Sequence, residues 1–141
     1  MGGYDGGAYL ASVERLDPRE GKWAAVGSMA ARRGGHACAA LADGTLGALG
    51  GYSSAATQEC ELFEPRTGTW RCLPELLDCR AYGAAAAVGG DVFAVGGLRS
   101  DMQTHSGLLE RRRAGAGPWE HVDLPANANP RRSFLAACAL V

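Results

Sequence analysis

The sequence predicts an all-β chain made of repeated four-stranded units. A pair of glycines occurs three times, and each pair is followed by a tryptophan at a similar distance. The glycine pairs are 48 and 46 residues apart and the tryptophans are 47 and 49 apart, a period typical of a repeated supersecondary unit. The residues that define the repeat are Gly2, Gly3, Trp23, Gly50, Gly51, Trp70, Gly96, Gly97 and Trp119.

One hairpin of each unit lies between a glutamate and the tryptophan. Segments 13–23 and 60–70 both fit strand, turn and strand, with an acidic residue and a proline opening the turn. Gly21 and Gly68 suit the left-handed conformation that ends such a turn. Segment 110–118 lacks the apolar residue and the acidic-proline turn, so we expect the outer strands of the third unit to be poorly ordered.

The second hairpin of each unit surrounds a different turn. Asp43-Gly44 and Gly89-Gly90 each separate two apolar runs, which indicates a two-residue hairpin. Two hairpins give four antiparallel strands in a unit, and repeated units of this kind are the blades of a β-propeller. The alanine-rich run 84–87 suits the innermost strand, where blades converge and side chains must be small. The glycines around it leave too few residues for a stable helix.

Composition excludes several classes of function. The net charge of −1 gives no electrostatic reason to expect nucleic acid as a partner. No run of about 18 apolar residues is present, and the chain does not open with a signal peptide, so we expect no membrane partner and a cytoplasmic location. The five cysteines are odd in number and lack C-x-x-C spacing, which favours reduced, structural thiols and no metal site.

The chain resembles kelch repeats. That signature is an apolar strand ending in Gly-Gly, then an aromatic residue, then a tryptophan, and Gly50-Gly51, Phe63 and Trp70 match it in order. Leu16 takes the aromatic position in the first unit and Arg112 takes it in the third. The resemblance covers essentially the whole chain and implies a kelch β-propeller.

The length predicts only part of such a ring. The resemblance implies a closed ring of about six blades, whereas this chain holds about three, so we expect a partial propeller that is not a closed ring. The expected units are the end of one blade, a full blade, a full but degenerate blade and the first strand of the next, at 1–29, 30–76, 77–125 and 126–141. We therefore expect a fragment of a longer kelch protein, or a chain that completes its ring by self-association.

The predicted topology brings two sets of loops to one rim, which we take as the candidate binding surface. One set follows the glycine pairs, and the other precedes each innermost strand. Tyrosine and arginine are favoured binding residues, because they combine a large contact area with forked hydrogen bonding. The predicted partner-binding residues are Tyr4, Arg33, Tyr52, Ser53, Arg80, Tyr82 and Arg132. Leu98 and Ala81 interrupt the pattern on one side. An alternative for Arg32 and Arg80 is that they brace neighbouring blades through backbone carbonyls.

The resemblance implies a non-enzymatic platform for protein–protein interaction. It is similar to the propeller of a ubiquitin-ligase substrate adaptor, a class that binds acidic peptides at this rim, and other members of the family bind actin. We predict no catalytic residue and no cofactor: the three histidines, His36, His105 and His121, have no metal-like spacing. The alternatives are a fragment of a galactose-oxidase-like kelch enzyme that binds a small molecule, and a truncated piece without independent function.

Overall fold

Ten β-strands make up the regular structure. The computed structural model describes residues 1–115 and 117–138, and within them no helix is long and apolar enough to cross a membrane. The strands are β1 (Val13–Asp17), β2 (Lys22–Val26), β3 (Ala37–Ala40), β4 (Leu46–Leu49), β5 (Cys60–Glu64), β6 (Thr69–Leu73), β7 (Ala84–Val88), β8 (Asp91–Val95), β9 (Leu109–Arg112) and β10 (Glu120–Val122).

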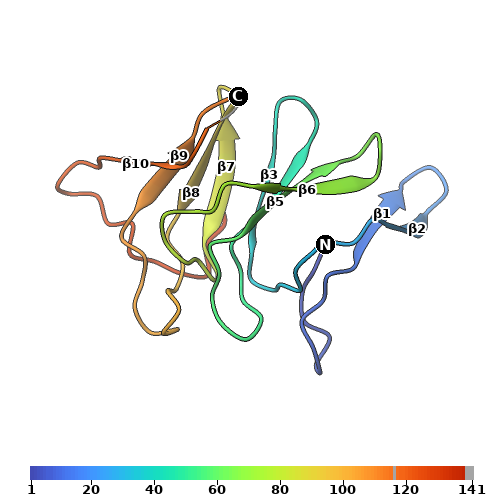
Figure 1. Ribbon diagram of the computed structural model, residues 1–141, viewed down its shortest axis with the longest axis horizontal. Coiled ribbons are helices and arrows are strands. Elements are labelled where there is room, and N and C mark those ends of the chain that lie inside the picture. Colours follow the sequence, from blue (N-terminus) through green and yellow to red (C-terminus); the bar gives the residue numbers. More distant parts are fainter. Residues whose placement is uncertain (116, 139–141) are drawn as a thin grey trace.

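These strands form one hairpin and two four-stranded sheets, all antiparallel. β1 pairs with β2, β3 to β6 pair in chain order, and β7 to β10 pair in the same way. Figure 1 shows the three units arranged side by side, with the alanine-rich β3 and β7 adjacent where the two full sheets meet. Alanine at these positions leaves room for the backbones of neighbouring sheets to approach closely.

Two turns show how far turn chemistry predicts hairpin geometry. Val88 pairs with Asp91 across Gly89 and Gly90, both at positive φ, so this is the two-residue hairpin that the sequence predicts. The same prediction for Asp43-Gly44 is wrong. There the Leu41 amide bonds to the Thr45 carbonyl and encloses a three-residue loop, because the Asp43 carboxylate accepts hydrogen bonds from the Thr45 amide and hydroxyl.

The degenerate third unit has both of its outer strands, contrary to our expectation of poor order. β9 pairs with β10, and Trp119, directly before β10, is only 3 % exposed. Ion pairs from Arg111 and Arg113 to Glu120 replace the missing turn signal. No strand is assigned in 123–138, the described part of the expected further unit, because a strand needs a ladder partner; residues 139–141 lie outside the described residues.

The core lies between the units. Leu49, Cys60, Leu76, Val92 and Trp119 form the main cluster between the two full sheets, and Val13, Met29 and Ala48 form a second cluster beside the hairpin. The indole of Trp119 donates to the Pro74 carbonyl at 3.1 Å, as that of Trp70 donates to Gly27 at 2.7 Å. Each tryptophan therefore fastens its unit to the unit before it.

Candidate functional site

The glycine pairs connect each unit to the loop of the next. The amide of the second glycine in each pair donates to a carbonyl in the loop that precedes the next innermost strand. Gly3 bonds to Arg33 at 2.9 Å, Gly51 to Arg80 at 2.7 Å and Gly97 to Arg132 at 2.6 Å. The two sets of loops therefore meet along one rim, which we call the loop rim.

Replacing Gly50 with a larger residue should destabilise the fold. Gly68 is a matched control, because it has a similar backbone conformation but no close neighbour. Both have positive φ, 63° and 70°. A Cβ at Gly50 would lie 2.5 Å from the Arg80 carbonyl oxygen, and at Gly68 it would meet nothing within 4 Å. We expect Gly68→Ala to lower the free energy of unfolding by about 1–2 kcal/mol from backbone conformation alone, and Gly50→Ala by clearly more. Urea titrations of both variants measure the difference, and equal losses would contradict the close approach.

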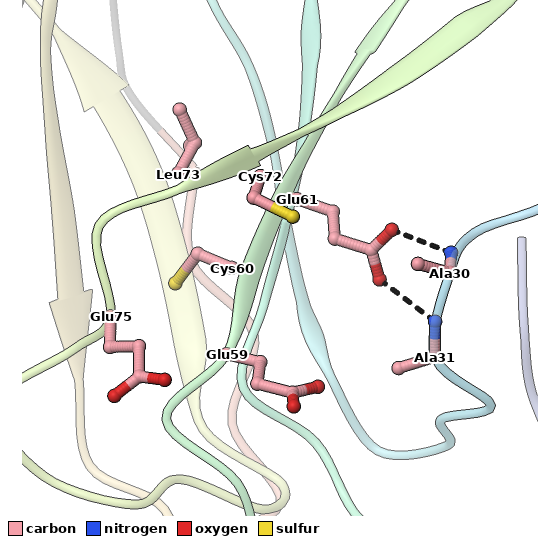
Figure 2. Close-up of a pocket in the computed structure, with 8 residues that line it drawn as sticks. All are labelled: Ala30, Ala31, Glu59, Cys60, Glu61, Cys72, Leu73 and Glu75. Carbon is pink, nitrogen blue, oxygen red and sulfur yellow. Dashed lines mark hydrogen bonds between the residues drawn. The ribbon is translucent and has the colours of Figure 1, made fainter.

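Arg33 is buried beneath the loop rim, where both of its terminal nitrogens form hydrogen bonds. Its guanidinium is 1 % exposed and donates through Nη1 to the carbonyls of Gly50 at 2.7 Å and Glu59 at 3.0 Å, and through Nη2 to Glu61 at 2.6 Å. The Glu61 carboxylate also accepts from the amides of Ala30 and Ala31, as Figure 2 shows. One ion pair thus ties the loop before β3 to β4 and β5.

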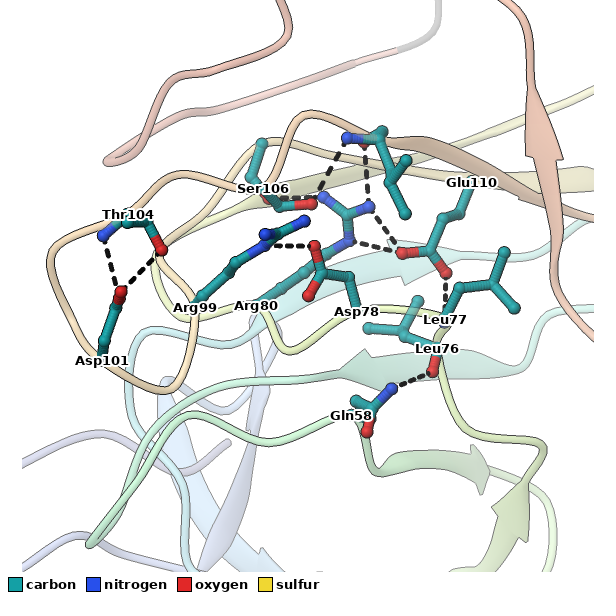
Figure 3. A network of polar contacts seen from close by, with 12 residues as sticks. Gln58, Leu76, Leu77, Asp78, Arg80, Arg99, Asp101, Thr104, Ser106 and Glu110 are labelled. Atoms are coloured by element: carbon teal, nitrogen blue, oxygen red, sulfur yellow. Dashed lines mark hydrogen bonds and ion pairs between the residues drawn. The ribbon is translucent and has the colours of Figure 1, made fainter.

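Arg80 repeats this arrangement in the next unit (Figure 3). It donates to the carbonyls of Gly96 at 2.5 Å and Leu108 at 2.9 Å and pairs with Glu110 at 2.6 Å. Glu110 has no exposed surface and also accepts from the Leu77 amide at 2.6 Å. The recurring glutamates at 61 and 110 are therefore architectural.

These contacts correct the placement of two predicted partner-binding residues. Arg33 and Arg80 are 1 % and 3 % exposed, so a partner at the rim cannot reach their guanidinium groups. The sequence placed the arginines on the correct loops, but the sheet that follows each loop offers carbonyls and a carboxylate that accept hydrogen bonds from the guanidinium group. Arg80 does bond to backbone carbonyls, as the alternative expected, but Gly96 and Leu108 belong to its own unit and not to a neighbouring blade. Arg32 does contact the unit before it, through Nη1 and the Tyr9 carbonyl at 3.3 Å.

The loop arginines Arg33, Arg80 and Arg132 share a further feature. The residue two positions after each of them adopts a left-handed conformation. It is Gly35 (φ 58°) in one unit, Tyr82 (φ 57°) in the next and Phe134 (φ 56°) in the last. The Phe134 amide donates to the Tyr82 carbonyl at 2.7 Å, and the Tyr82 amide donates to the Gly35 carbonyl. A chain of backbone hydrogen bonds thus runs from unit to unit, and two aromatic residues occupy positions that favour glycine.

The aromatic side chains of the loops gather on the rim. Tyr4 and Tyr9 have ring centroids 5.0 Å apart, Tyr9 and Tyr52 are 5.4 Å apart, and Tyr82 stacks on Phe134 at 4.6 Å. The Tyr9 ring lies against Gly34 and the Tyr82 ring against Gly35, so the two groups are neighbours. We call these five residues the rim cluster. It contains all four tyrosines of the chain.

The predicted residues fall into separate groups in the structure. Tyr4, Tyr52 and Tyr82 join the rim cluster, and Tyr4 is 59 % exposed. Ser53 lines a separate hollow with Arg32, and the Arg132 side chain is exposed. Phe134, which is 75 % exposed, was missed. It lies in register with Tyr82, two residues after Arg132, so aligning the repeats could have found it; Tyr9 has no counterpart in the repeat.

The cavity in Figure 2 holds neither a reactive nucleophile nor a cluster of metal ligands among the described residues. It measures about 300 Å³ and is lined by Glu59, Cys60, Glu61, Cys72 and Glu75, among others. Burial raises the pKa of the Cys60 thiol to about 11, which keeps it protonated and a poor nucleophile at neutral pH. Within residues 1–115 and 117–138, no three His, Cys, Asp or Glu side chains lie close enough to hold a metal ion.

His36 lies below the loop rim, at the start of β3. Both of its ring nitrogens are buried, and neither has a hydrogen-bond partner among the described residues. Burial, and then the positive charge of Arg33, lowers the pKa of His36 from 6.5 to about 4. The imidazole is therefore neutral at physiological pH.

This histidine should make the fold sensitive to mild acid. Below pH 6.5 the unfolded chain binds a proton at His36 that the folded chain accepts only near pH 4. Stability should therefore fall by up to about 1.4 kcal/mol per pH unit across that window. Urea titrations between pH 7 and 4 measure the slope, and His36→Gln should flatten it. A slope that persists in His36→Gln would assign the effect to other groups.

The chain is similar in sequence to known proteins that contain kelch repeats. The family model for the Kelch motif matches residues 1–30. Kelch repeat protein C2 of Cowpox virus (strain GRI-90 / Grishak) is 30% identical over 106 residues, covering 74% of this chain and 20% of that protein. Kelch-like protein 35 of Mus musculus is 31% identical over 132 residues, covering 89% of this chain and 21% of that protein. The chain thus spans about a fifth of the length of these relatives.

A solved structure identifies the fold. The structure of YjhT superposes with a TM-score of 0.75 at 15% identity, over 91% of this chain and 52% of that chain. At this identity the likeness concerns the fold alone. The units are all-β, antiparallel blades of a propeller, and they do not form a closed ring.

Proposed function

Because the chain belongs to the kelch-repeat family, we propose that it is a non-enzymatic platform that binds a protein partner at the loop rim. The observation that carries this proposal is the rim cluster, which gathers five aromatic side chains from loops of four repeat units. Aromatic residues supply large, rigid contact area and dominate the binding energy of many interfaces.

Backbone strain in the rim cluster supports the same proposal. A side chain at positive φ costs about 1–2 kcal/mol relative to glycine, and both Tyr82 and Phe134 adopt this conformation. Gly35 fills the equivalent position without that cost. Strain retained at exposed aromatic residues supports selection for contact with a partner, because packing inside the chain does not require Phe134 at 75 % exposure.

The proposed surface differs from the one predicted from sequence. It keeps Tyr4, Tyr52, Ser53, Tyr82 and Arg132, gains Tyr9 and Phe134, and loses the buried Arg33 and Arg80. We further propose that the platform acts as the substrate-binding part of a ubiquitin-ligase adaptor. The support for this finer role is the similarity to Kelch-like protein 35.

The rim is tested by comparing the partners that different variants retain. Wild-type protein and Phe134→Gly serve as baits under identical conditions, with Arg66→Ala, an exposed turn residue on an outer hairpin, as the control. Phe134→Gly relieves backbone strain, so it should be at least as stable as a typical surface variant while its partner binding drops at least tenfold. A partner held equally by all three baits would place the binding surface elsewhere.

We also propose that the chain can associate with a second copy. Each full sheet is closed by an Arg–Glu ion pair, and the repeat supplies one further arginine and glutamate, Arg132 and Glu14. Both are exposed, and neither forms an ion pair with another described residue. Sedimentation velocity tests whether they meet between copies. Arg132→Glu alone should abolish association, and the double variant Arg132→Glu with Glu14→Arg should restore it. A wild-type protein that stays monomeric at all concentrations would exclude the contact.

A further inference from the structure

A cleft separate from the rim cluster lies beside the last unit. It has a volume of about 370 Å³ and is lined by Arg99, Thr104, His105, Gly107 and Arg131. Two arginines from distant parts of the chain therefore open onto one hollow, although the chain as a whole is close to neutral. Neither arginine takes part in the buried pairs that close the sheets.

Three polar groups of the cleft, Arg99, Thr104 and His105, are held in place by contacts behind them. Asp78 accepts from Arg99 Nε at 2.7 Å, a contact drawn in Figure 3. Asp101 accepts from the amide of Thr104 at 2.9 Å and from its hydroxyl at 2.7 Å. The His105 Nε2 atom lies 3.2 Å from the Ser133 hydroxyl. These contacts fix the side chains before any ligand arrives, which lowers the entropic cost of binding.

The donors that face the cleft remain available. Asp78 engages only Arg99 Nε, and the described residues offer no hydrogen-bond acceptor to either terminal nitrogen of that guanidinium. The Arg131 side chain is exposed and has no ion pair within the described part of the chain. Its Nε would lie 3.3 Å from a Cβ built on Gly107, so the absence of a side chain at 107 gives Arg131 its place along the wall.

The chemistry of these donors selects an oxyanion. Two guanidinium forks in one hollow match the several oxygens of a phosphate group, and each arginine can form paired, charge-assisted hydrogen bonds to it. A carboxylate has two oxygens and one charge, so it would leave part of this donor set unused. A phosphate monoester carries about −1.5 to −2 charges at pH 7 and three acceptor oxygens.

We propose that the cleft lined by Arg99, Thr104, His105, Gly107 and Arg131 binds a phosphate monoester. The site is distinct from the rim cluster and does not depend on the partner proposed for it. Its ligand is either a free small phosphate or a phosphorylated side chain of a protein segment. Arg99 and Arg131 bind the phosphate oxygens, and Asp78 orients Arg99.

Titration calorimetry on the full chain tests this site with O-phosphoserine, inorganic phosphate, serine and a phosphoserine-containing peptide as probes. Saturable binding of the phosphate-bearing probes and none of serine is expected. Arg99→Gln and Arg131→Gln should each weaken binding at least tenfold, whereas Arg66→Gln, the control with the same charge change, should leave it within twofold. All three arginines are exposed, and circular dichroism verifies the fold of each variant.

The probes also distinguish the two sources of phosphate. A phosphopeptide that binds at least tenfold more tightly than inorganic phosphate identifies a protein segment as the ligand, and equal affinities identify a free phosphate. Absence of saturable binding to every phosphate-bearing probe would overturn the site. So would binding that Arg66→Gln weakens as much as Arg99→Gln and Arg131→Gln do, because a general charge effect would then account for it.

Discussion

Replacing Glu110 with alanine should destabilise the fold by about 3–5 kcal/mol, the usual cost of leaving one member of a buried ion pair without its partner. Glu110 has no exposed surface and accepts hydrogen bonds from Arg80 and from the Leu77 amide. The variant therefore leaves the buried Arg80 guanidinium and the Leu77 amide without the carboxylate that accepts their hydrogen bonds. Chemical denaturation followed by circular dichroism measures the loss.

Two further variants separate the ion pair from simple loss of packing. Glu120→Ala removes an exposed carboxylate that pairs with Arg111 and Arg113, so it should cost only about 0–1 kcal/mol. The double variant Arg80→Met with Glu110→Leu removes both charges and should recover much of the stability that Glu110→Ala loses. A double variant no more stable than Glu110→Ala would show that the geometry of the pair, not its charge balance, holds the sheet.

The second large effect is expected at Trp119, where alanine should cost about 3–5 kcal/mol. This side chain is 3 % exposed, packs in the main core cluster and donates to the Pro74 carbonyl of the preceding unit. Its removal leaves a cavity between the two full sheets and an unfilled backbone acceptor. Thermal and urea unfolding of Trp119→Ala measure the change.

The repeat itself provides the control for this prediction. Trp23 occupies the same position in the first hairpin, yet it is 65 % exposed. Trp23→Ala should therefore change the free energy of unfolding by no more than about 0.5 kcal/mol. Similar losses in the two variants would mean that the indole acts through its own hairpin and not through contact with the preceding unit.

The fold was predictable because the same sequence pattern occurs in each unit, so each unit supports the strand assignment of the others. Glycine pairs, tryptophans and turn residues recur in register, so the strands of the two full sheets could be placed from spacing alone. The Asp43 turn was not predictable in detail, because its length depends on a side-chain contact with Thr45. The outer strands of the last unit are joined by the Arg111–Glu120 pair, which the repeat does not encode.

The binding surface was harder to predict than the fold, for a physical reason. Sequence spacing places a residue on a loop but does not say whether its side chain turns toward solvent or into the sheet that follows the loop. Arg33 and Arg132 hold equivalent positions, and one is buried while the other is exposed. The difference lies in whether a glutamate of the third strand stands opposite, as Glu61 does for Arg33.

The backbone hydrogen bonds that join Gly35, Tyr82 and Phe134 give the rim an unusual freedom to diversify. The hydrogen bonds between adjacent blades at these positions use main-chain atoms only, so they form whichever side chain is attached, and the stacking of Tyr82 on Phe134 is added to them. Glycine, tyrosine and phenylalanine all occupy the position within this one chain. Recognition at the loop rim can therefore vary at these positions, at the cost of local backbone strain and, at Gly35, of a close contact with the Tyr82 ring, which a Cβ there would approach to 2.6 Å.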